Sequence, residues 1–327
     1  MILAIDIGGT QFGVGLGTDD GKIVKKVRQT TDRDAGAEWM IERILETGRH
    51  LMEGAPRKVA VCGISFGGPV DFETQRIKNS THVAGWDNVA LPAIVEESLG
   101  MPALADNDAN VGALGEFVFG AGQGCRNLVY YNVGTGIGGG IIIDGEIYRG
   151  SDGNAGEFGH CPIVDNGPLC DCGNRGCLEA LCSGKSIGNR AAEEVRKQPR
   201  RGKAILRAGN GSVTAKAVFD AAKLRDPLAC EIVDEVSRFL GMSVATAMNT
   251  FAPDAIVIGG SVSKSGRTLL GPLKEQANRF LMGVHRPHLK ILKARLGSDS
   301  QLIGAIALAR QAGIQKSGAR IQNERRG

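Results

Sequence analysis

One histidine and three cysteines crowd into a short stretch of this sequence. The four residues are His160, Cys170, Cys172 and Cys177. One imidazole and three thiolates complete a tetrahedral zinc site with no vacant position, which is typical of a structural rather than a catalytic ion. Gly173 and Gly176 allow the chain to wrap tightly around such an ion. We therefore predict that these four residues hold a structural Zn²⁺.

Two glutamates flank the predicted zinc ligands. Glu157 stands shortly before His160, and Glu179 stands shortly after Cys177. A loop fixed by a metal ion would present both carboxylates, which can accept hydrogen bonds from the hydroxyl groups of a sugar. Surface salt bridges are the alternative explanation for both glutamates.

Two glycine turns have the composition of phosphate-binding sites. They are Gly8-Gly9-Thr10 and Gly134-Thr135-Gly136. Glycine lets backbone N–H groups approach phosphate oxygens closely, and Thr10 and Thr135 can add hydroxyl donors. Either turn alone could be a plain hairpin. Neither turn matches the Walker loop or the dinucleotide-binding glycine motif.

A third polar group is the run Asp106-Asn107-Asp108-Ala109-Asn110, which precedes a stretch of helical composition from Val111 to Val118. Asp and Asn are good N-cap residues, so a purely structural role is one reading. The other reading is that a carboxylate at a strand-to-helix junction, beside an amide that can hold a hydroxyl, serves as the general base for a polyol. The two roles can coexist.

The elements that must position these residues form a repeated unit. Residues 2–6, the first glycine turn, residues 12–16 and the turn at Asp19-Asp20-Gly21 read as two strands leading into a third. Residues 128–132, the second glycine turn, residues 137–143 and Asp144-Gly145 repeat this plan, so that Asp6 corresponds to Asn132 and Asp20 to Asp144. The repeat indicates a duplication, and it favours phosphate binding by both turns.

The rest of the chain alternates between helical and strand patterns. Helices are expected over residues 37–52, 212–224, 227–250, 267–282 and 301–312, and further strands over residues 59–64 and 255–258. The alternation predicts an α/β fold whose two lobes place both turns at one cleft. We expect a smaller lobe of residues 1–115 and 300–320, a larger lobe of residues 116–299, and a flexible basic tail over residues 316–327.

Composition excludes several classes of protein. The chain has 327 residues, 42% of them apolar and 23% charged, which indicates a globular protein of two lobes. Its net charge of +4 derives from the basic residues after position 309, so we expect no nucleic-acid partner. No apolar run reaches the roughly 20 residues of a membrane span, and no signal peptide precedes the first strand. We expect a cytoplasmic protein with reduced cysteines and no membrane association.

These motifs resemble those of the ROK family, whose name joins repressors, open reading frames and sugar kinases, within the actin-like ATPase superfamily. Asp6-Ile7-Gly8-Gly9-Thr10 is similar to the first phosphate motif of the family, the run from Asn132 to Gly140 to its second, and Ile258-Gly259-Gly260-Ser261 to its adenosine motif. The stretch from Glu157 through Cys177 to Glu179 resembles the family signature with its zinc site. The resemblance extends from residue 2 to about residue 312.

The resemblance implies a role for each candidate residue. Asp108 becomes the catalytic base. The implied sugar-binding residues are Gly68, Thr81, Asn107, Asp108, Glu157, His160 and Glu179. The implied residues for ATP and Mg²⁺ are Asp6, Gly8, Gly9, Thr10, Gly134, Thr135, Gly136, Gly259 and Gly260. Members commonly have Pro-Gly where this chain has Gly68-Pro69-Val70, so the pocket wall departs from the family pattern.

The activity so implied is transfer of the γ-phosphoryl group of MgATP to the 6-hydroxyl of a hexose, with glucose the first choice. The motifs do not separate glucose from N-acetylmannosamine, N-acetylglucosamine or fructose, nor ATP from polyphosphate. A sugar-responsive repressor of the same family would need a helix-turn-helix ahead of the strand that begins at residue 2, and we therefore expect a kinase. Relatives usually pair, so a homodimer or homotetramer is expected.

Overall fold

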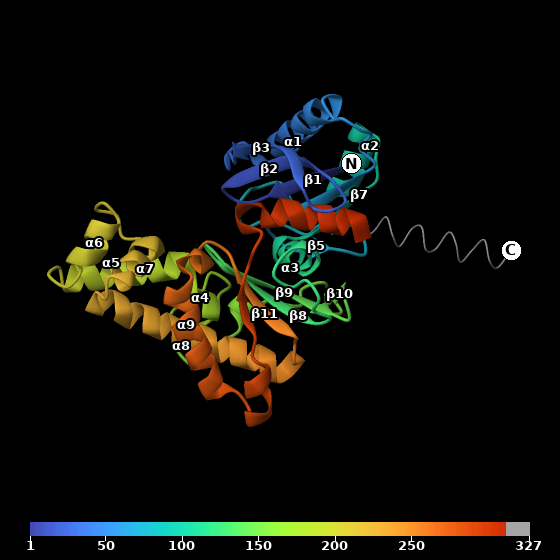
Figure 1. The fold of residues 1–327 in the computed structure, drawn as a ribbon. Helices are drawn as coiled ribbons and strands as arrows, with labels where there is room; N and C mark the ends of the chain where they lie inside the picture. Colours follow the sequence, from blue (N-terminus) through green and yellow to red (C-terminus); the bar gives the residue numbers. More distant parts are fainter. Residues whose placement is uncertain (312–327) are drawn as a thin grey trace. The chain divides into compact units, whose positions relative to one another are not determined.

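The computed structural model describes residues 1–311 of the chain, and Figure 1 shows its elements in sequence order. The chain forms two compact units, which are described in turn. The first unit comprises Met1–Gln123, Ile147–Ala155 and the chain from Ser298 onward, and the second comprises Gly124–Glu146 and Gly156–Gly297. The sequence analysis expected boundaries between the two lobes near residues 115 and 299. It did not predict that residues 147–155 belong to the first unit. The expected tail, residues 316–327, lies outside the described residues.

The sheet of the first unit has five strands in the order β3-β2-β1-β4-β7. These strands are β1 (Ile2–Ile7), β2 (Gln11–Gly17), β3 (Ile23–Thr30), β4 (Val61–Phe66) and β7 (Ala103–Asn107). The strands β1, β2 and β3 are antiparallel, whereas β1, β4 and β7 are parallel. Because the carboxyl ends of parallel strands meet at one sheet edge, Asp6 and Asn107 come to that edge.

Helices and a small hairpin complete the first unit. They are α1 (Gly36–Glu53), α2 (Leu91–Leu99), α3 (Asp108–Phe119), β5 (Val70–Asp71) and β6 (Arg76–Ile77). Residues 300–311 are helical and appear in red beside the sheet in Figure 1. A Cβ atom at Gly63 would overlap the backbone of Ala305, and one at Gly304 would overlap that of Val111. Glycine therefore lets this last helix lie directly on β4 and α3.

The sheet of the second unit repeats the first. Its five strands are β8 (Leu128–Val133), β9 (Ile137–Ile143), β10 (Glu146–Ile147), β11 (Ala255–Gly259) and β12 (Ile291–Lys293), in the order β10-β9-β8-β11-β12. Asp6 lies opposite Gly13 next to the first turn, and Asn132 lies opposite Gly138 next to the second. The matching order and register confirm the predicted duplication.

The second unit also holds most of the helices. They are η1 (Phe158–His160), α4 (Leu178–Cys182), α5 (Gly184–Lys197), α6 (Lys203–Ala208), α7 (Ala215–Lys223), α8 (Pro227–Phe251), η2 (Val262–Ser265), α9 (Arg267–Phe280) and η3 (Gly283–His288). Sequence analysis missed α5 and α6. Ile187, Ala191 and Val195 form the buried face of α5 at a spacing of four residues, a pattern obscured by the many charged residues between them.

Within residues 1–311, no helix combines the length and the apolar character needed to cross a lipid bilayer.

Candidate active site and metal centre

The junction of β7 and α3 places Asp108 at the start of a helix. Asn107 is the N-cap of α3: its side-chain oxygen accepts hydrogen bonds from the backbone N–H groups of Ala109 (2.9 Å) and Asn110 (3.4 Å). Its Nδ2 donates to the carbonyl of Gly68 at 3.0 Å. The capping role proposed for this run is therefore real, and it leaves the carboxylate of Asp108 in the first turn, where the helix dipole stabilises negative charge.

Asp6 is a partly buried carboxyl near the end of β1. Burial is the main reason that the pKa of Asp6 rises to about 7, and the charge of Asp108 raises it further, while Arg28 opposes the shift. The pKa therefore responds to both desolvation and a second carboxylate. Two acidic groups close enough to repel each other form a natural binding place for a divalent cation.

The first glycine turn is held by side chains from neighbouring loops. The hydroxyl of Thr31 donates to the carbonyl of Gly8 at 2.9 Å, and Nε of Arg33 donates to the carbonyl of Gly9 at 2.8 Å. The ring of His82 lies so close to Gly9 that a Cβ atom there would be 2.6 Å from its Cγ. Sequence analysis did not single out Arg33 or His82, because their contacts with the turn are long-range.

Gly67 and Gly68 form a wall next to Asp108. A Cβ atom at Gly67 would lie 3.9 Å from Oδ2 of Asp108, and one at Gly68 would lie 3.1 Å from the carbonyl oxygen of Asn79. These contacts bring the predicted pocket segments into one place in the first unit. The side chain of Thr81 is exposed beyond them.

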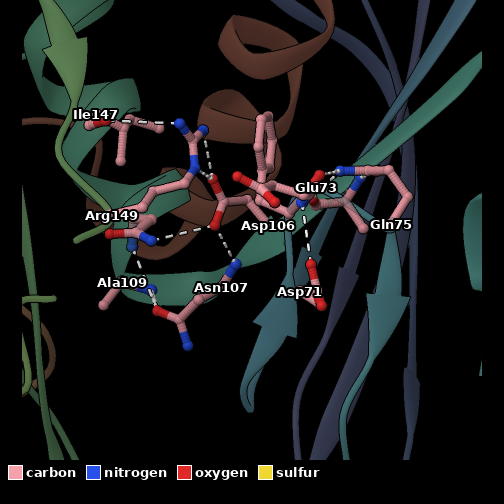
Figure 2. A network of polar contacts seen from close by, with 11 residues as sticks. Asp71, Glu73, Gln75, Asp106, Asn107, Ala109, Ile147 and Arg149 are labelled. Atoms are coloured by element: carbon pink, nitrogen blue, oxygen red, sulfur yellow. Dashed lines mark hydrogen bonds and ion pairs between the residues drawn. The ribbon is translucent and has the colours of Figure 1, made fainter. Parts of the chain in front are cut away.

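Figure 2 shows a polar network behind this junction that sequence analysis missed. Nε of Arg149 donates a hydrogen bond to Oδ2 of Asp106 at 2.9 Å, and Nη2 forms an ion pair with the same oxygen at 2.7 Å. The carboxylate of Asp106 is 2% exposed. A buried acid requires a cationic partner, but its identity depends on the return of residues 147–155 to the first unit.

The second glycine turn is held by Glu179. Oε2 of Glu179 accepts a hydrogen bond from the backbone N–H of Ile137 at 2.7 Å, and a Cβ atom at Gly136 would overlap this oxygen. The first residue of α5, Gly184, donates its N–H to the carbonyl of Gly134 at 2.8 Å. A Cβ atom at Gly134 would meet nothing within 4 Å, so the turn has open space beside it.

The four predicted zinc ligands form one cluster. Their ligand atoms all lie within 4.8 Å of one another. Sγ of Cys172 is 3.7 Å from Sγ of Cys177, and Sγ of Cys170 is 3.6 Å from Nδ1 of His160. Four ligands at about 2.3 Å from a tetrahedral zinc would be separated by about 3.8 Å, so the cluster has the dimensions of the predicted site.

His160 connects this cluster to Glu157. With Nδ1 directed at the cysteines, Nε2 lies 3.9 Å from Oε2 of Glu157. Burial raises the pKa of Glu157, His160 lowers it, and Glu179 raises it again. The two glutamates are thus electrostatic neighbours, and a salt bridge to a surface cation does not explain Glu179, whose oxygen binds the turn.

Gly259 and Gly260 lie at the end of β11, where the chain packs closely against Tyr130 and Val133 of β8. A Cβ atom at Gly259 would overlap the ring of Tyr130, and Gly260 has a φ of 78°, a left-handed conformation that favours glycine. The hydroxyl of Ser263 donates to the carbonyl of Gly260 at 2.8 Å. Both glycines of this predicted adenosine motif are therefore required by the packing and the backbone conformation, independently of any ligand.

Comparisons with known proteins place the chain in one family. The profile of the ROK family matches residues 2–312. The chain is 36% identical to a glucokinase of Thermotoga maritima over 95% of this chain and 97% of that protein. A crystal structure of a ROK family glucokinase from Streptomyces griseus in complex with glucose and AMPPNP is 35% identical, covers 95% of this chain and 99% of that one, and has a TM-score of 0.83.

A transcriptional regulator has a similar fold. The structure of a ROK family regulator homologous to the E. coli MLC protein is 26% identical, with a TM-score of 0.85 over 95% of this chain and 78% of that one. The fold alone thus does not separate enzyme from regulator, and the separation must come from the residues of the site.

Proposed function

This chain belongs to the ROK family and has its actin-like fold, and we propose that it is a sugar kinase that transfers the γ-phosphoryl group of ATP to the 6-hydroxyl of glucose. The observation that carries the proposal is the grouping of three features in the first unit. They are Asp108 in the first turn of α3, Asp6 near the end of β1, and the Gly8-Gly9-Thr10 turn. These groups supply a general base, a cation-binding carboxyl and a phosphate-binding turn, which are the requirements of phosphoryl transfer.

Asp108 would act as the base. As the 6-oxygen of glucose bonds to the γ-phosphorus and the bond to the β–γ bridging oxygen breaks, the carboxylate of Asp108 accepts the hydroxyl proton. ADP leaves with the bridging oxygen. Asn107 and the wall at Gly68 would orient the hydroxyl groups beside the base, and Thr81 would lie at the edge of the pocket.

The nucleotide would be held by the glycine turns. The N–H groups of Gly8 and Gly134 close the two turns by donating to the carbonyls of Gln11 and Gly136, so the N–H groups of Gly9 and Thr10 in the first turn, and of Thr135 and Gly136 in the second, would bind phosphate oxygens. Gly259 and Gly260 would adjoin the adenosine. The open space beside Gly134 supports this assignment. Mg²⁺, when bound, would neutralise the phosphate oxygens, and Asp6 would hold it through water. The pKa of Asp6 fits this task, because a cation would offset the repulsion between Asp6 and Asp108.

The cysteine cluster would hold a structural zinc ion. The donor set and the interatomic distances both fit Zn²⁺. Cys177 immediately precedes α4, whose first turn carries Glu179, so the metal would fix the carboxylate that holds the second turn. His160 would bind zinc through Nδ1 and a sugar hydroxyl through Nε2, beside Glu157. A reduced thiolate site and the use of ATP fit the cytoplasm.

A coupled assay with purified protein tests this function. Glucose, mannose, fructose, N-acetylglucosamine, N-acetylmannosamine and galactose would each be offered with ATP and with polyphosphate. We expect glucose with ATP to give the highest kcat/KM. Turnover of another sugar would retain the kinase and change its substrate. Glucose binding in calorimetry without turnover on any pair would contradict the kinase and support a regulator.

A further inference from the structure

The guanidinium group of Arg149 is fixed from two sides. Two of its nitrogens contact a single oxygen, Oδ2 of Asp106: Nε donates a hydrogen bond at 2.9 Å and Nη2 forms an ion pair at 2.7 Å. Its Cζ atom lies 3.5 Å from the centre of the Phe72 ring, a close cation–π contact. The side chain of Arg149 is 20% exposed, so solvent screens this pair only partly. Figure 2 shows Arg149 reaching the acid from the segment after β10.

The other oxygen of Asp106 accepts hydrogen bonds from residues on both sides of Asp108. Oδ1 accepts hydrogen bonds from the backbone N–H of Asn107 at 2.7 Å and from Nδ2 of Asn110 at 3.1 Å. Asn107 precedes Asp108, and Asn110 lies in the same helical turn. One carboxylate therefore joins Arg149 to both sides of the proposed base.

The strand β7, which leads to this junction, is held by the loop between β5 and β6 that also carries Phe72. β7 is the last strand in its sheet, and the amide of Gln75 occupies its free edge: Oε1 accepts from the N–H of Ala105 at 2.8 Å. Nε2 of Gln75 donates to the carbonyl of Phe72 at 2.7 Å. We call Phe72, Gln75, Asp106 and Arg149 the junction brace. The brace holds β7 by its edge and by its end (Figure 2).

We propose that Arg149 is a positioning residue for the phosphoryl transfer: through Asp106 it fixes the main chain at Asn107 and so aims the carboxylate of Asp108. This inference rests on the proposed role of Asp108 as the base. Without Arg149, the buried Asp106 loses its cation and must rotate toward solvent or take up a proton, and either change weakens its hold on Asn107. A misplacement of about 1 Å lowers turnover by roughly 100-fold.

The test compares Arg149→Gln with a matched pair elsewhere. Arg190 forms an ion pair with Glu235 in the second unit, and its side chain is 32% exposed against 20% for Arg149. Glu235 is 38% exposed whereas Asp106 is 2% exposed, so Arg190→Gln is the control for loss of an arginine whose acid remains in contact with solvent. We expect Arg149→Gln to lower kcat roughly 100-fold while the KM for ATP changes less than about threefold. Arg190→Gln should leave kcat within about twofold. Hydrogen exchange at the amides of residues 107–110 should be faster in Arg149→Gln and unchanged in Arg190→Gln.

Two further variants guard against a simple folding defect. Arg149→Lys keeps the charge but not the planar fork, so its kcat should lie between those of wild type and Arg149→Gln. The double variant Asp106→Asn, Arg149→Gln removes the unpaired buried charge, so its Tm should exceed that of Arg149→Gln while its kcat remains low.

The inference fails if exchange at residues 107–110 is the same in Arg149→Gln and wild type. It also fails if exchange is faster while kcat is retained, because the aim of Asp108 would then not depend on Arg149. A wild-type protein without kinase activity would remove the proposed function instead. Hydrogen exchange would still decide whether Arg149 holds the junction.

Discussion

The two units share one sheet plan but carry different residues at the equivalent position before the glycine turn. Asp6 stands before the first glycine turn, and Asn132 stands before the second, in the same register. Asp6 is partly buried, interacts electrostatically with Asp108 and has a pKa of about 7, whereas Asn132 carries no charge. Duplication therefore gave two glycine turns of the same plan, and within residues 1–311 the pair of carboxyl groups that we propose for the chemistry lies beside the first turn.

The units also differ in the length of chain that joins their third and fourth strands. In the first unit, α1 alone lies between β3 and β4, whereas in the second the cluster of His160 with three cysteines and the helices α4 to α8 lie between β10 and β11. This long insertion carries Glu157, His160 and Glu179. The comparison assigns the proposed base and cation site to the first unit, and much of the proposed sugar recognition to the insertion in the second.

The largest effect should result from the loss of the base. Asp108→Asn is expected to lower kcat by about 10³–10⁴-fold, because a neutral amide cannot accept the proton. Glucose binding should remain measurable by calorimetry. Asp19→Asn, at an exposed turn of the same unit, is the matched control. Turnover close to wild type in Asp108→Asn would contradict the assignment of chemistry to the first unit.

Loss of zinc should damage the insertion and leave the base intact. Metal analysis is expected to find about one zinc per chain, and Cys172→Ala should reduce that content and lower the Tm by roughly 5–10 °C. The KM for glucose should rise more than the KM for ATP. Cys161→Ala, an exposed cysteine outside the cluster, should change neither zinc content nor Tm. An active, stable protein without zinc would show that the cluster has another role.

A smaller effect should separate phosphate binding from folding at the second turn. Gly134→Ala adds a methyl group where no atom lies within 4 Å, so we expect a Tm within about 2 °C of wild type. The methyl group would occupy the space assigned to phosphate and raise the KM for ATP roughly tenfold. Gly271→Ala, in equally open space on α9, is the control. An unchanged KM for ATP would leave the first turn as the only phosphate site.

The smallest effect concerns stability and pH. Asp6 has a folded-state pKa of about 7 against 3.8 in the unfolded chain. Below pH 3.8 the carboxyl is protonated in both states, so its ionisation does not lower the free energy of unfolding. Its ionisation in the unfolded chain lowers stability as the pH rises from 3.8 to about 7, and the penalty is constant above that. Without ATP or Mg²⁺, Asp6→Asn should match wild type at pH 4 and gain roughly 5 °C in Tm at pH 8. Equal Tm values at pH 8 would mean that the burial of ionised Asp6 does not destabilise the folded protein.

Much of this architecture was predictable because it is encoded locally. Glycine turns between apolar runs indicated the hairpins, and the cysteine spacing indicated a cluster that the structure then brought together. The helix from 184 to 197 was missed because charged residues mask its apolar face. Residue types at short spacing were informative, whereas a mixed charge pattern was not.

The sequence alone determined the duplicated sheets, the two glycine turns, the zinc-type donor set and the acidic run at Asp106 to Asp108, because each depends on neighbours within a few residues. Tertiary structure alone decided that Asp6 interacts electrostatically with Asp108, that Glu179 holds the second turn, and that Arg149 is the partner of Asp106. Those contacts join residues tens of positions apart. Local propensity cannot specify them, because they depend on which strand ends share a sheet edge and on where the chain returns.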